Sequence, residues 1–246
     1  MILKQWDYLP DNMKNESVKK YYDMLDKKRG SLYFKRIFDI LAAIIILIIL
    51  SPIFVVLSIA IKLDSKGPIM FRQVRVTQYG RTFRIFKFRT MVNNAEKIGT
   101  QVTTKNDVRV TKIGSILRKC RLDELPQLLN IISGDMSFVG TRPEVPKYVD
   151  RYTEEMLATL LLPAGITSEA SIEYKDEDRV LSEAQNVDDT YVCKILPGKM
   201  KYNLEAIKRF SFFREIKTMF RTVKVITGKM DRNKKMKVKS DREVSI

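Results

Sequence analysis

The longest apolar run of the chain lies at residues 40–61. This stretch contains no charged residue and consists mainly of Ile, Leu, Val and Ala. At about 1.5 Å per residue, a helix of this length would cross the hydrocarbon core of a bilayer. Because apolar side chains surround the whole helix, a membrane segment is favoured over a core helix, which would keep one polar face. We therefore predict a membrane helix over residues 37–63.

Ser51 and Pro52 interrupt the middle of this run. Proline lacks a backbone donor and clashes with the preceding turn, so it kinks a helix. Both flanks are basic, and positive charge favours the cytoplasmic side of a membrane. The flanking cations are Lys35, Arg36, Lys62, Lys66, Arg72 and Arg75. The residues alone leave two topologies open: a kinked spanning helix, or a re-entrant helix that breaks at Ser51-Pro52 and returns.

Asp39 lies at the edge of the predicted membrane segment, near Lys35 and Arg36. An unpaired charge at that depth is costly, so we expect Asp39 to form an ion pair with one of these neighbours. This pair would anchor the helix rather than take part in catalysis.

The rest of the chain predicts a mixed α/β domain that is mainly helical. Residues 62–89 show short strands with a turn at Tyr79-Gly80, and residues 112–134 show helices, one of them beginning near Asp123. An acidic, loop-rich stretch and basic helices of amphipathic character follow, at residues 161–192 and 196–226. We predict a loosely ordered polar extension at residues 1–30, one domain over residues 31–227 and a basic tail at residues 228–246.

The amino-acid composition limits which partners and which catalytic groups the protein could use. The formal charge of +16 over 246 residues indicates an anionic partner, such as phosphorylated ligands, an acidic membrane surface or nucleic acid. The chain has no histidine, which excludes Ser-His and Cys-His nucleophile pairs. Its two cysteines provide neither a disulfide framework nor a metal cluster. Any catalysis must therefore rest on carboxylates, Lys, Arg, Tyr, hydroxyl groups or a bound metal ion.

The adjacent acids Asp123 and Glu124 are the first candidates for a site. In most proteins such a pair would cap a helix. Here Arg118, Lys119 and Arg121 lie within five residues before the pair, and Arg142 follows it. A helix start would itself attract phosphate. Carboxylates that hold Mg²⁺, cations that hold phosphate oxygens and one free acid are the groups that phosphoryl transfer needs.

Several blocks of sequence resemble the bacterial sugar transferase family, the monotopic phosphoglycosyl transferases. These blocks are KRIFD at residues 35–39, GPIMFRQVR at 67–75, FKFRTM at 86–91, DVRVTKIG at 107–114, LRK at 117–119, LDELPQL at 122–128, GDMSFVG at 134–140 and RP at 142–143. The blocks stand in the family's order, and the resemblance extends from about residue 35 to residue 226. The chain is similar to the small members, which lack additional membrane helices.

The resemblance implies a reaction. Asp123 would be a nucleophile that takes a sugar 1-phosphate from a UDP-sugar and releases UMP, and Glu124 would be a Mg²⁺ ligand. The covalent phosphosugar-aspartate would then transfer the sugar 1-phosphate to polyprenyl (undecaprenyl) phosphate. Arg142 would hold phosphate, and we expect the same of the other cations of these blocks: Arg118, Lys87, Arg89, Arg72 and Arg75.

The resemblance also implies a location and a topology. The membrane helix would be re-entrant and broken at Ser51-Pro52, with amphipathic helices in the interface, on the cytoplasmic face of the bacterial inner (plasma) membrane. Its partners would be the UDP-sugar, polyprenyl phosphate and anionic lipids rather than nucleic acid. The reaction would be the first membrane step in making a surface glycan such as a capsule, an exopolysaccharide, an O-antigen or a glycoprotein.

One stretch departs from the family pattern. After PAGIT at residues 163–167, many members carry an arginine that helps to hold the donor, whereas this chain continues SEASIEY. Lys175 and Arg179 are candidates to replace that arginine, and the donor sugar stays open. The alternative reading is a non-enzymatic membrane protein whose cytoplasmic domain binds nucleic acid or lipid. The helices at residues 112–134 argue against nucleic-acid binding, because they offer few polar side chains that could contact base edges.

Overall fold

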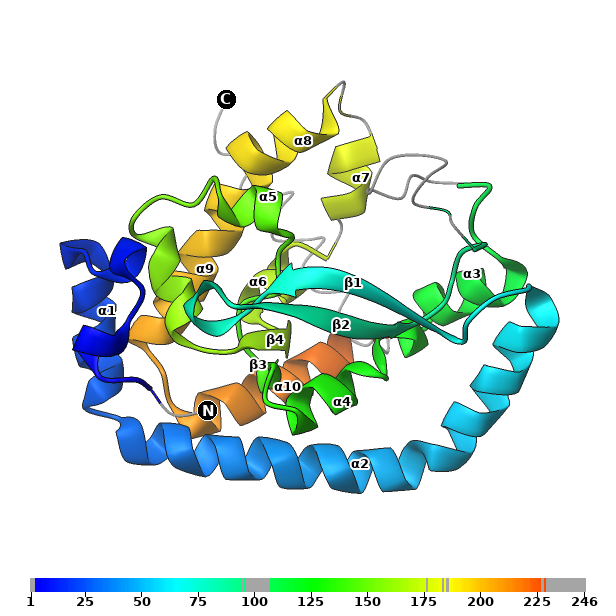
Figure 1. Cartoon of the computed structure of the whole chain (residues 1–246), viewed down its shortest axis with the longest axis horizontal. Coiled ribbons are helices and arrows are strands. Elements are labelled where there is room, and N and C mark those ends of the chain that lie inside the picture. The colour runs from blue at the N-terminus through cyan, green and yellow to red at the C-terminus, as the bar shows by residue number, and fades with distance from the viewer. Residues whose placement is uncertain are drawn as a thin grey trace.

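The computed structural model of this protein describes residues 3–93, 95, 107–175, 177–182, 184, 186–226 and 228. Two small sheets lie among helices. The sequence predicts the strands within residues 62–89 but not the second sheet. Strands β1 (Met70–Val76) and β2 (Thr82–Phe88) form an antiparallel hairpin, and β3 (Met136–Val139) pairs in parallel with β4 (Ala164–Thr167). Figure 1 shows the hairpin across the middle of the molecule.

Helices account for most of the remaining structure. The α-helices are α1 (Glu16–Asp26), α2 (Arg29–Asp64), α3 (Lys112–Lys119), α4 (Gln127–Ile132), α5 (Pro146–Val149), α6 (Glu169–Glu173), α7 (Glu177–Ser182), α8 (Val187–Thr190), α9 (Leu196–Lys208) and α10 (Phe212–Ile226). Short 3₁₀ turns include η3 (Gln78–Gly80), η5 (Leu122–Glu124) and η6 (Met156–Leu161), and η7 (Tyr191–Ile195) is a single π-helical turn. The stretch that we predicted to be loop-rich therefore holds several short helices.

Helix α2 is the predicted membrane helix, and it begins earlier than expected, at Arg29. Its most apolar 18-residue window has a mean hydropathy of 3.3, and only 6% of that window is buried in the protein. A core helix would be largely buried, so α2 presents its apolar surface outward. Figure 1 shows α2 running along the lower edge and then turning upward toward α3.

The helix stays continuous through Pro52. Proline has no N–H to donate to the carbonyl four residues earlier, which belongs to Ile48. The hydroxyl of Ser51 donates to that carbonyl instead, at 2.8 Å. The Ser-Pro step therefore allows a bend without leaving the Ile48 carbonyl unsatisfied in an apolar environment.

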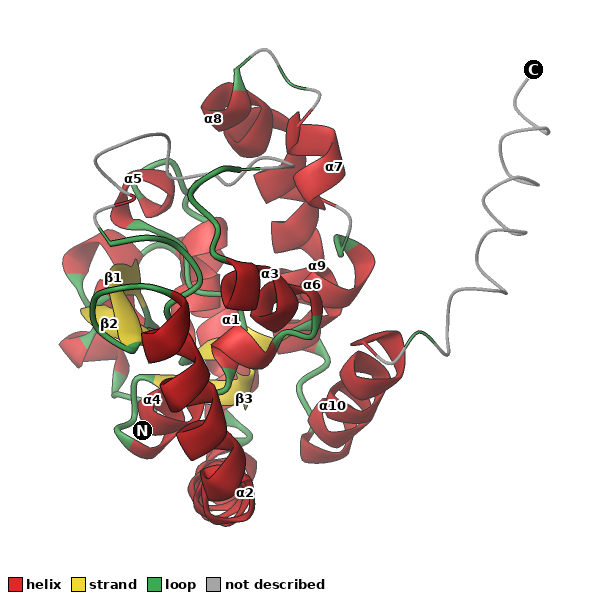
Figure 2. Ribbon diagram, turned by 90° about the vertical axis from the view of Figure 1, so that its right-hand side faces the viewer, coloured by secondary structure: helices red, strands yellow, loops and turns green. Residues whose placement is uncertain are grey.

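Both ends of α2 pack onto the same body. Near its first turn, Leu32 joins a buried cluster with Leu25 and Phe210, and near its last turn Ile61 packs with Phe88 and Leu117. Between them, Ala43 packs with residues of β2, α4 and β3. In Figures 1 and 2, α10 also lies at the α2 side of the molecule.

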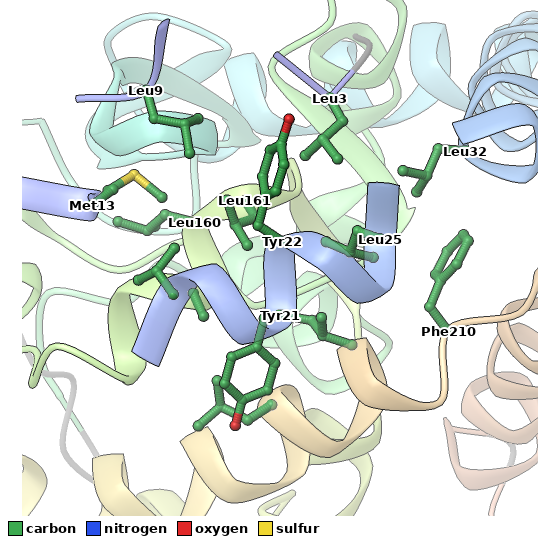
Figure 3. Close-up of a cluster of buried hydrophobic side chains, with 14 of the residues drawn as sticks. Leu3, Leu9, Met13, Tyr21, Tyr22, Leu25, Leu32, Leu160, Leu161 and Phe210 are labelled. Atoms are coloured by element: carbon green, nitrogen blue, oxygen red, sulfur yellow. The ribbon is translucent and has the colours of Figure 1, made fainter. Parts of the chain in front are cut away.

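The expectation of a loosely ordered extension at residues 1–30 is wrong. Residues 3–26 fold over η6 and α9, and Tyr21, Val18 and Leu25 are fully buried there (Figure 3). The side chain of Asn15 caps α1 by accepting from the N–H of Val18 at 2.9 Å. The stretch looks polar because apolar residues occupy only one face of α1, and that face covers the core.

Asp39 forms the predicted ion pair, with Lys35 (Nζ–Oδ2 3.0 Å). It also accepts from the hydroxyl of Ser137 in β3 at 2.7 Å. Lys35 contacts that hydroxyl as well and reaches Glu215 of α10 at 2.8 Å. This buried set, which we call the base cluster (Lys35, Asp39, Ser137, Glu215), joins α2 to β3 and α10.

Candidate functional site

The carboxylate pair Asp123-Glu124 lies in the 3₁₀ turn η5, between α3 and α4. The expected helix start at Asp123 is wrong, because α4 begins only at Gln127 and is six residues long. Arg121, just before the turn, has a left-handed backbone (φ 56°), which redirects the chain out of α3. Side chains rather than a helix terminus therefore set the electrostatics of the pair.

Helix α3 approaches the end of β2 closely enough to bring its cations to this turn. A Cβ at Gly114 would lie 2.1 Å from the carbonyl oxygen of Thr90, so only glycine permits the approach. The hydroxyl of Thr111 caps the helix by accepting from the Gly114 N–H at 3.0 Å. Arg118 then donates from Nε to the Thr90 hydroxyl at 2.9 Å, and its charge lies near Asp123, whose pKa it lowers.

Glu124 is surrounded by cations. Its Oε1 lies 2.7 Å from Nη2 of Arg142 and 3.2 Å from Nζ of Lys87 in β2, with Arg121 at 4.0 Å. Burial by itself would raise the pKa of Glu124, but Arg142 and Lys87 outweigh burial and hold that pKa well below its usual range. We therefore expect Glu124 to be ionised at neutral pH.

Asp123 differs from its neighbour. Its side chain is buried, with 8% exposed, yet within the described part of the chain no hydrogen bond or ion pair to its carboxylate is seen. Burial raises the pKa of Asp123, and Glu124 adds to the effect, whereas Lys87, Arg118 and Arg121 oppose it. A desolvated carboxylate with cations nearby and no fixed partner is suited to attack an electrophile.

A hollow beside the pair is lined by Arg75, Ile85, Lys87, Gln127, Arg142 and Pro143. The antiparallel register places Arg75 and Lys87 on the same face of the hairpin, above α4. Nε of Arg75 and Nε2 of Gln127 are buried, and neither has a hydrogen-bond partner among the described residues. A buried donor without an acceptor carries a desolvation cost, and a bound anion would supply the missing acceptor. These two donors are therefore suited to an anion.

The loop that carries Arg142 is fixed by two glycines. A Cβ at Gly165 would lie 2.1 Å from the backbone nitrogen of Gly140, and the Gly165 N–H donates to the carbonyl of Thr141 at 2.9 Å. The loop that follows β3 therefore packs closely against β4. Arg75 also donates to the carbonyl of Pro143 at 3.3 Å, which ties the loop to the hairpin.

The structure therefore brings together Asp123, Glu124, Lys87, Arg75, Arg118 and Arg142. Two predicted phosphate-binding residues lie elsewhere. Arg72 points to the opposite face of the hairpin from Lys87, where it stacks on Phe86 (4.2 Å to the ring centroid). Arg89 donates to the carbonyls of Ile61 and Ser65, so it holds the end of α2. The alternation of a strand separates these cations, which a count of basic residues does not show.

Sequence reasoning missed Gln127. A single amide carries no signal of its own, although Gln127 lies only four residues after Asp123. Of the two candidates to replace the family's donor-binding arginine, Lys175 follows α6 and is partly buried. The side chain of Arg179 lies outside the described residues.

Comparison with known proteins agrees with this geometry. The profile of the bacterial sugar transferase family matches residues 30–229, which include every residue of the site. The chain belongs to the bacterial sugar transferase family. The matched region excludes α1 and the residues before it, so this sugar transferase carries an ordered N-terminal segment outside the part that the family shares.

Curated relatives act on undecaprenyl phosphate, according to their names. The chain is 38% identical over 200 residues to a UDP-N-acetylgalactosamine-undecaprenyl-phosphate N-acetylgalactosaminephosphotransferase of Aeromonas hydrophila, covering 80% of this chain and 44% of that protein. It is 36% identical over 199 residues to a UDP-glucose:undecaprenyl-phosphate glucose-1-phosphate transferase of Klebsiella pneumoniae, covering 78% and 40%. A protein of the latter name from Caulobacter vibrioides is 34% identical over 192 residues, covering 77% and 68%.

The chain thus spans less than half the length of the first two relatives. The sugars in these names differ, being N-acetylgalactosamine in one and glucose in the others. The comparisons therefore establish the family of this sugar transferase but not its donor.

Proposed function

We propose that this protein transfers a sugar 1-phosphate from a UDP-sugar to undecaprenyl or another polyprenyl phosphate. The observation that carries the proposal is the unpaired, buried Asp123 among cations that line a hollow, on a chain of the sugar transferase family. The names of the relatives support the donor and acceptor classes. In this proposal the reaction is the first membrane step of surface-glycan synthesis.

The proposed chemistry has two displacements at one phosphorus atom. A carboxylate oxygen of Asp123 attacks the sugar-linked phosphorus of the donor, and the bond from that phosphorus to the bridging oxygen breaks, so UMP leaves. A phosphate oxygen of the acceptor then attacks the same phosphorus, and the aspartyl bond breaks, which regenerates Asp123. Both steps bring anions together, so the cations Arg142, Lys87 and Arg75 must offset much of that repulsion.

Mg²⁺ is part of the proposal, with Glu124 as its ligand. The described residues contain no group of three acidic, Cys or His side chains that could hold a metal ion by themselves. Mg²⁺ is commonly held by one or two carboxylates together with substrate phosphates and water. All ion pairs of Glu124 use Oε1, so Oε2 suits such a site. When bound, the ion would supply charge neutralisation at the diphosphate.

The proposal places the protein at the cytoplasmic face of the bacterial plasma membrane, with α2 re-entrant. Leu32 and Ile61 pack onto the same folded body, so that body holds both flanks of the apolar segment, which supports a re-entrant path. Helices α3 and α4, which flank the carboxylate pair, both contact α2, so a lipid-linked acceptor would meet the site there. α10 carries exposed Phe213 and Phe220 beside basic residues, which suits anionic lipid. The basic tail at residues 229–246 lies outside the described residues.

Intact-protein mass spectrometry tests the chemistry. The purified protein in detergent receives Mg²⁺ and each UDP-sugar of a panel without acceptor. We expect one donor to add the mass of a single phosphosugar, mapped to the peptide that contains Asp123, together with one equivalent of UMP. UMP release only when donor and acceptor are both present, without an adduct, would show direct transfer and contradict the role of Asp123 as nucleophile.

Cysteine labelling tests the topology. In a variant with Cys120 and Cys193 replaced by serine, single cysteines at exposed Gln5 and Lys66 report on the two flanks of α2. We expect a membrane-impermeant maleimide to label neither position in intact cells and both after lysis. Labelling of position 5 alone in intact cells would establish a spanning helix.

A further inference from the structure

A second, largely buried polar cluster lies near Arg142, and none of its members belongs to the Asp123-Glu124 turn. It consists of Glu144, Tyr191, Lys199 and Glu177, which we call the rear cluster. Lys199 of α9 lies 3.0 Å from Oε2 of Glu177 and 3.8 Å from Oε1 of Glu144. The Tyr191 hydroxyl donates to Glu144 and accepts from Lys199 at 3.2 Å. Lys199 is only 3% exposed and Glu144 only 7%.

The rear cluster is connected to the site through the backbone. Glu144 stands two residues after Arg142 in the loop that leaves β3, and its carbonyl accepts from the Val76 N–H at 2.9 Å. Tyr191 begins the π-helical turn η7, and Glu177 begins α7. Figures 1 and 2 show α7 and α8 on the opposite side of the molecule from α2. The rear cluster therefore joins this outer part of the chain to the loop of the site.

Two sets of carboxylates act on Arg142: Glu124, which pairs with it, and the acids of the rear cluster. Glu124 raises the pKa of Arg142 most, and Glu177 and Glu144 raise it further, so both rear acids act on the same guanidinium. Without a cation of their own, the buried Glu144 and the partly buried Glu177 would compete with Glu124 for Arg142. Lys199 is the buried cation that pairs with both.

We propose that Lys199 is a positioning residue: it neutralises Glu144 and Glu177, so the guanidinium of Arg142 stays on Glu124 and beside the hollow that receives the donor's phosphates. Lys199 itself touches no substrate and acts through Arg142. This inference rests on the proposed function of the hollow. It assigns a role in donor binding to a helix and a loop outside the Asp123-Glu124 turn.

Kinetics of UMP release test the proposal on the full chain in detergent. Lys199→Met keeps the length of the side chain and removes its charge. We expect kcat/KM for the UDP-sugar to fall at least tenfold, mainly through a higher KM, because Arg142 is drawn toward the rear acids. The matched control is Lys201→Met, which removes an exposed lysine of the same helix and should stay within twofold of the wild type.

Two further variants separate positioning from general stability. Lys199→Met with Glu177→Gln removes one unbalanced acid and should recover most of the lost kcat/KM. In an Arg142→Lys background, Lys199→Met should change kcat/KM less than threefold, because the group through which it acts is altered. An equal loss in both backgrounds, or no loss in Lys199→Met, would overturn the proposal.

A readout without any donor keeps this inference separate from the proposed function. Phenylglyoxal modifies arginine, and mass spectrometry follows the peptide that contains Arg142. If Arg142 turns toward the rear acids, its modification in Lys199→Met should be slower than in the wild type and restored in the double variant. Unchanged reactivity would contradict the positioning role. A wild-type protein that releases no UMP from any donor would instead contradict the proposed function.

Discussion

Asp39 and Asp123 are both buried carboxylates with lysine neighbours, but only Asp39 has fixed hydrogen-bond and ion-pair partners among the described residues. Asp39 accepts from Lys35 and Ser137, and the base cluster closes around it. Asp123 is 8% exposed, and no bond to its carboxylate is seen within the described residues, although Lys87, Arg118 and Arg121 lie near it. The closed arrangement joins three elements of the fold, whereas the open one leaves a charged group available for an incoming ligand.

The contrast separates a buried carboxylate with fixed partners from one that remains open, for which we propose a chemical role. A buried ion pair with satisfied partners is costly to break, because removing one member strands the other. A buried carboxylate without a fixed partner already carries the cost of desolvation and keeps its lone pairs free. Exchanging one oxygen for nitrogen should therefore have opposite consequences at the two positions.

The largest effect is expected at Asp123. Asp123→Asn retains the shape of the side chain and removes the anionic nucleophile, so UMP release should fall by roughly three orders of magnitude or more. The melting temperature in detergent should stay level or rise, because a desolvated charge is lost. A variant that keeps more than a tenth of wild-type turnover would refute the nucleophile assignment.

Asp39→Asn should damage stability instead of chemistry. Lys35 would lose Asp39 and retain only Glu215, which is an anion only above its raised pKa of about 7. Breaking a buried pair costs about 3–5 kcal/mol. We expect a lower midpoint of thermal unfolding in detergent, followed by intrinsic fluorescence. Below that midpoint, the kcat for UMP release should remain within a few-fold of the wild type, and a large loss in the fully folded variant would remove the distinction between the two aspartates.

The pH dependence of turnover should report Asp123. Its pKa is raised by burial, so protonation removes the nucleophile at a higher pH than for an ordinary aspartate, whose pKa is about 3.9. Glu124 stays ionised throughout, because Arg142 and Lys87 hold its pKa well below its usual range against the effect of burial. We expect kcat/KM to fall about tenfold per pH unit on the acid side, with a midpoint above that ordinary value. A midpoint at or below it would show that neighbouring cations dominate over burial.

The smallest effect concerns the pH dependence of stability in the base cluster. Burial raises the pKa of Glu215 to about 7, although Lys35 opposes the shift. The folded protein therefore keeps a proton that the unfolded chain releases near pH 4.3. The stabilisation from this group is complete below that pH and is lost as the pH rises to about 7. The melting temperature of the wild type should fall as the pH rises from about 4.3 to about 7, and Glu215→Gln should make this fall shallower. If the melting temperature of the variant falls as steeply as that of the wild type, groups other than Glu215 cause the decline.

The sequence by itself determined the membrane helix, the family and the Asp123-Glu124 pair. Each of these is a local feature of the sequence: a long apolar run without charged residues, blocks in a fixed order and two adjacent acids. The ion pair of Asp39 with Lys35 was also predictable, because residues four apart share a helix face and charge at that depth needs a partner.

Only the tertiary structure decided which cations serve the site. Lys87 reaches Glu124 while Arg72, on the same hairpin, faces the other way, because strand register and not charge count fixes direction. The order of residues 3–26 depended on η6 and α9, far along the chain, whose apolar residues cover one face of α1. The rear cluster joins Glu144, Glu177, Tyr191 and Lys199 across four segments. Contacts between segments so distant in sequence leave no periodic or local pattern, so they emerge only when the chain is folded.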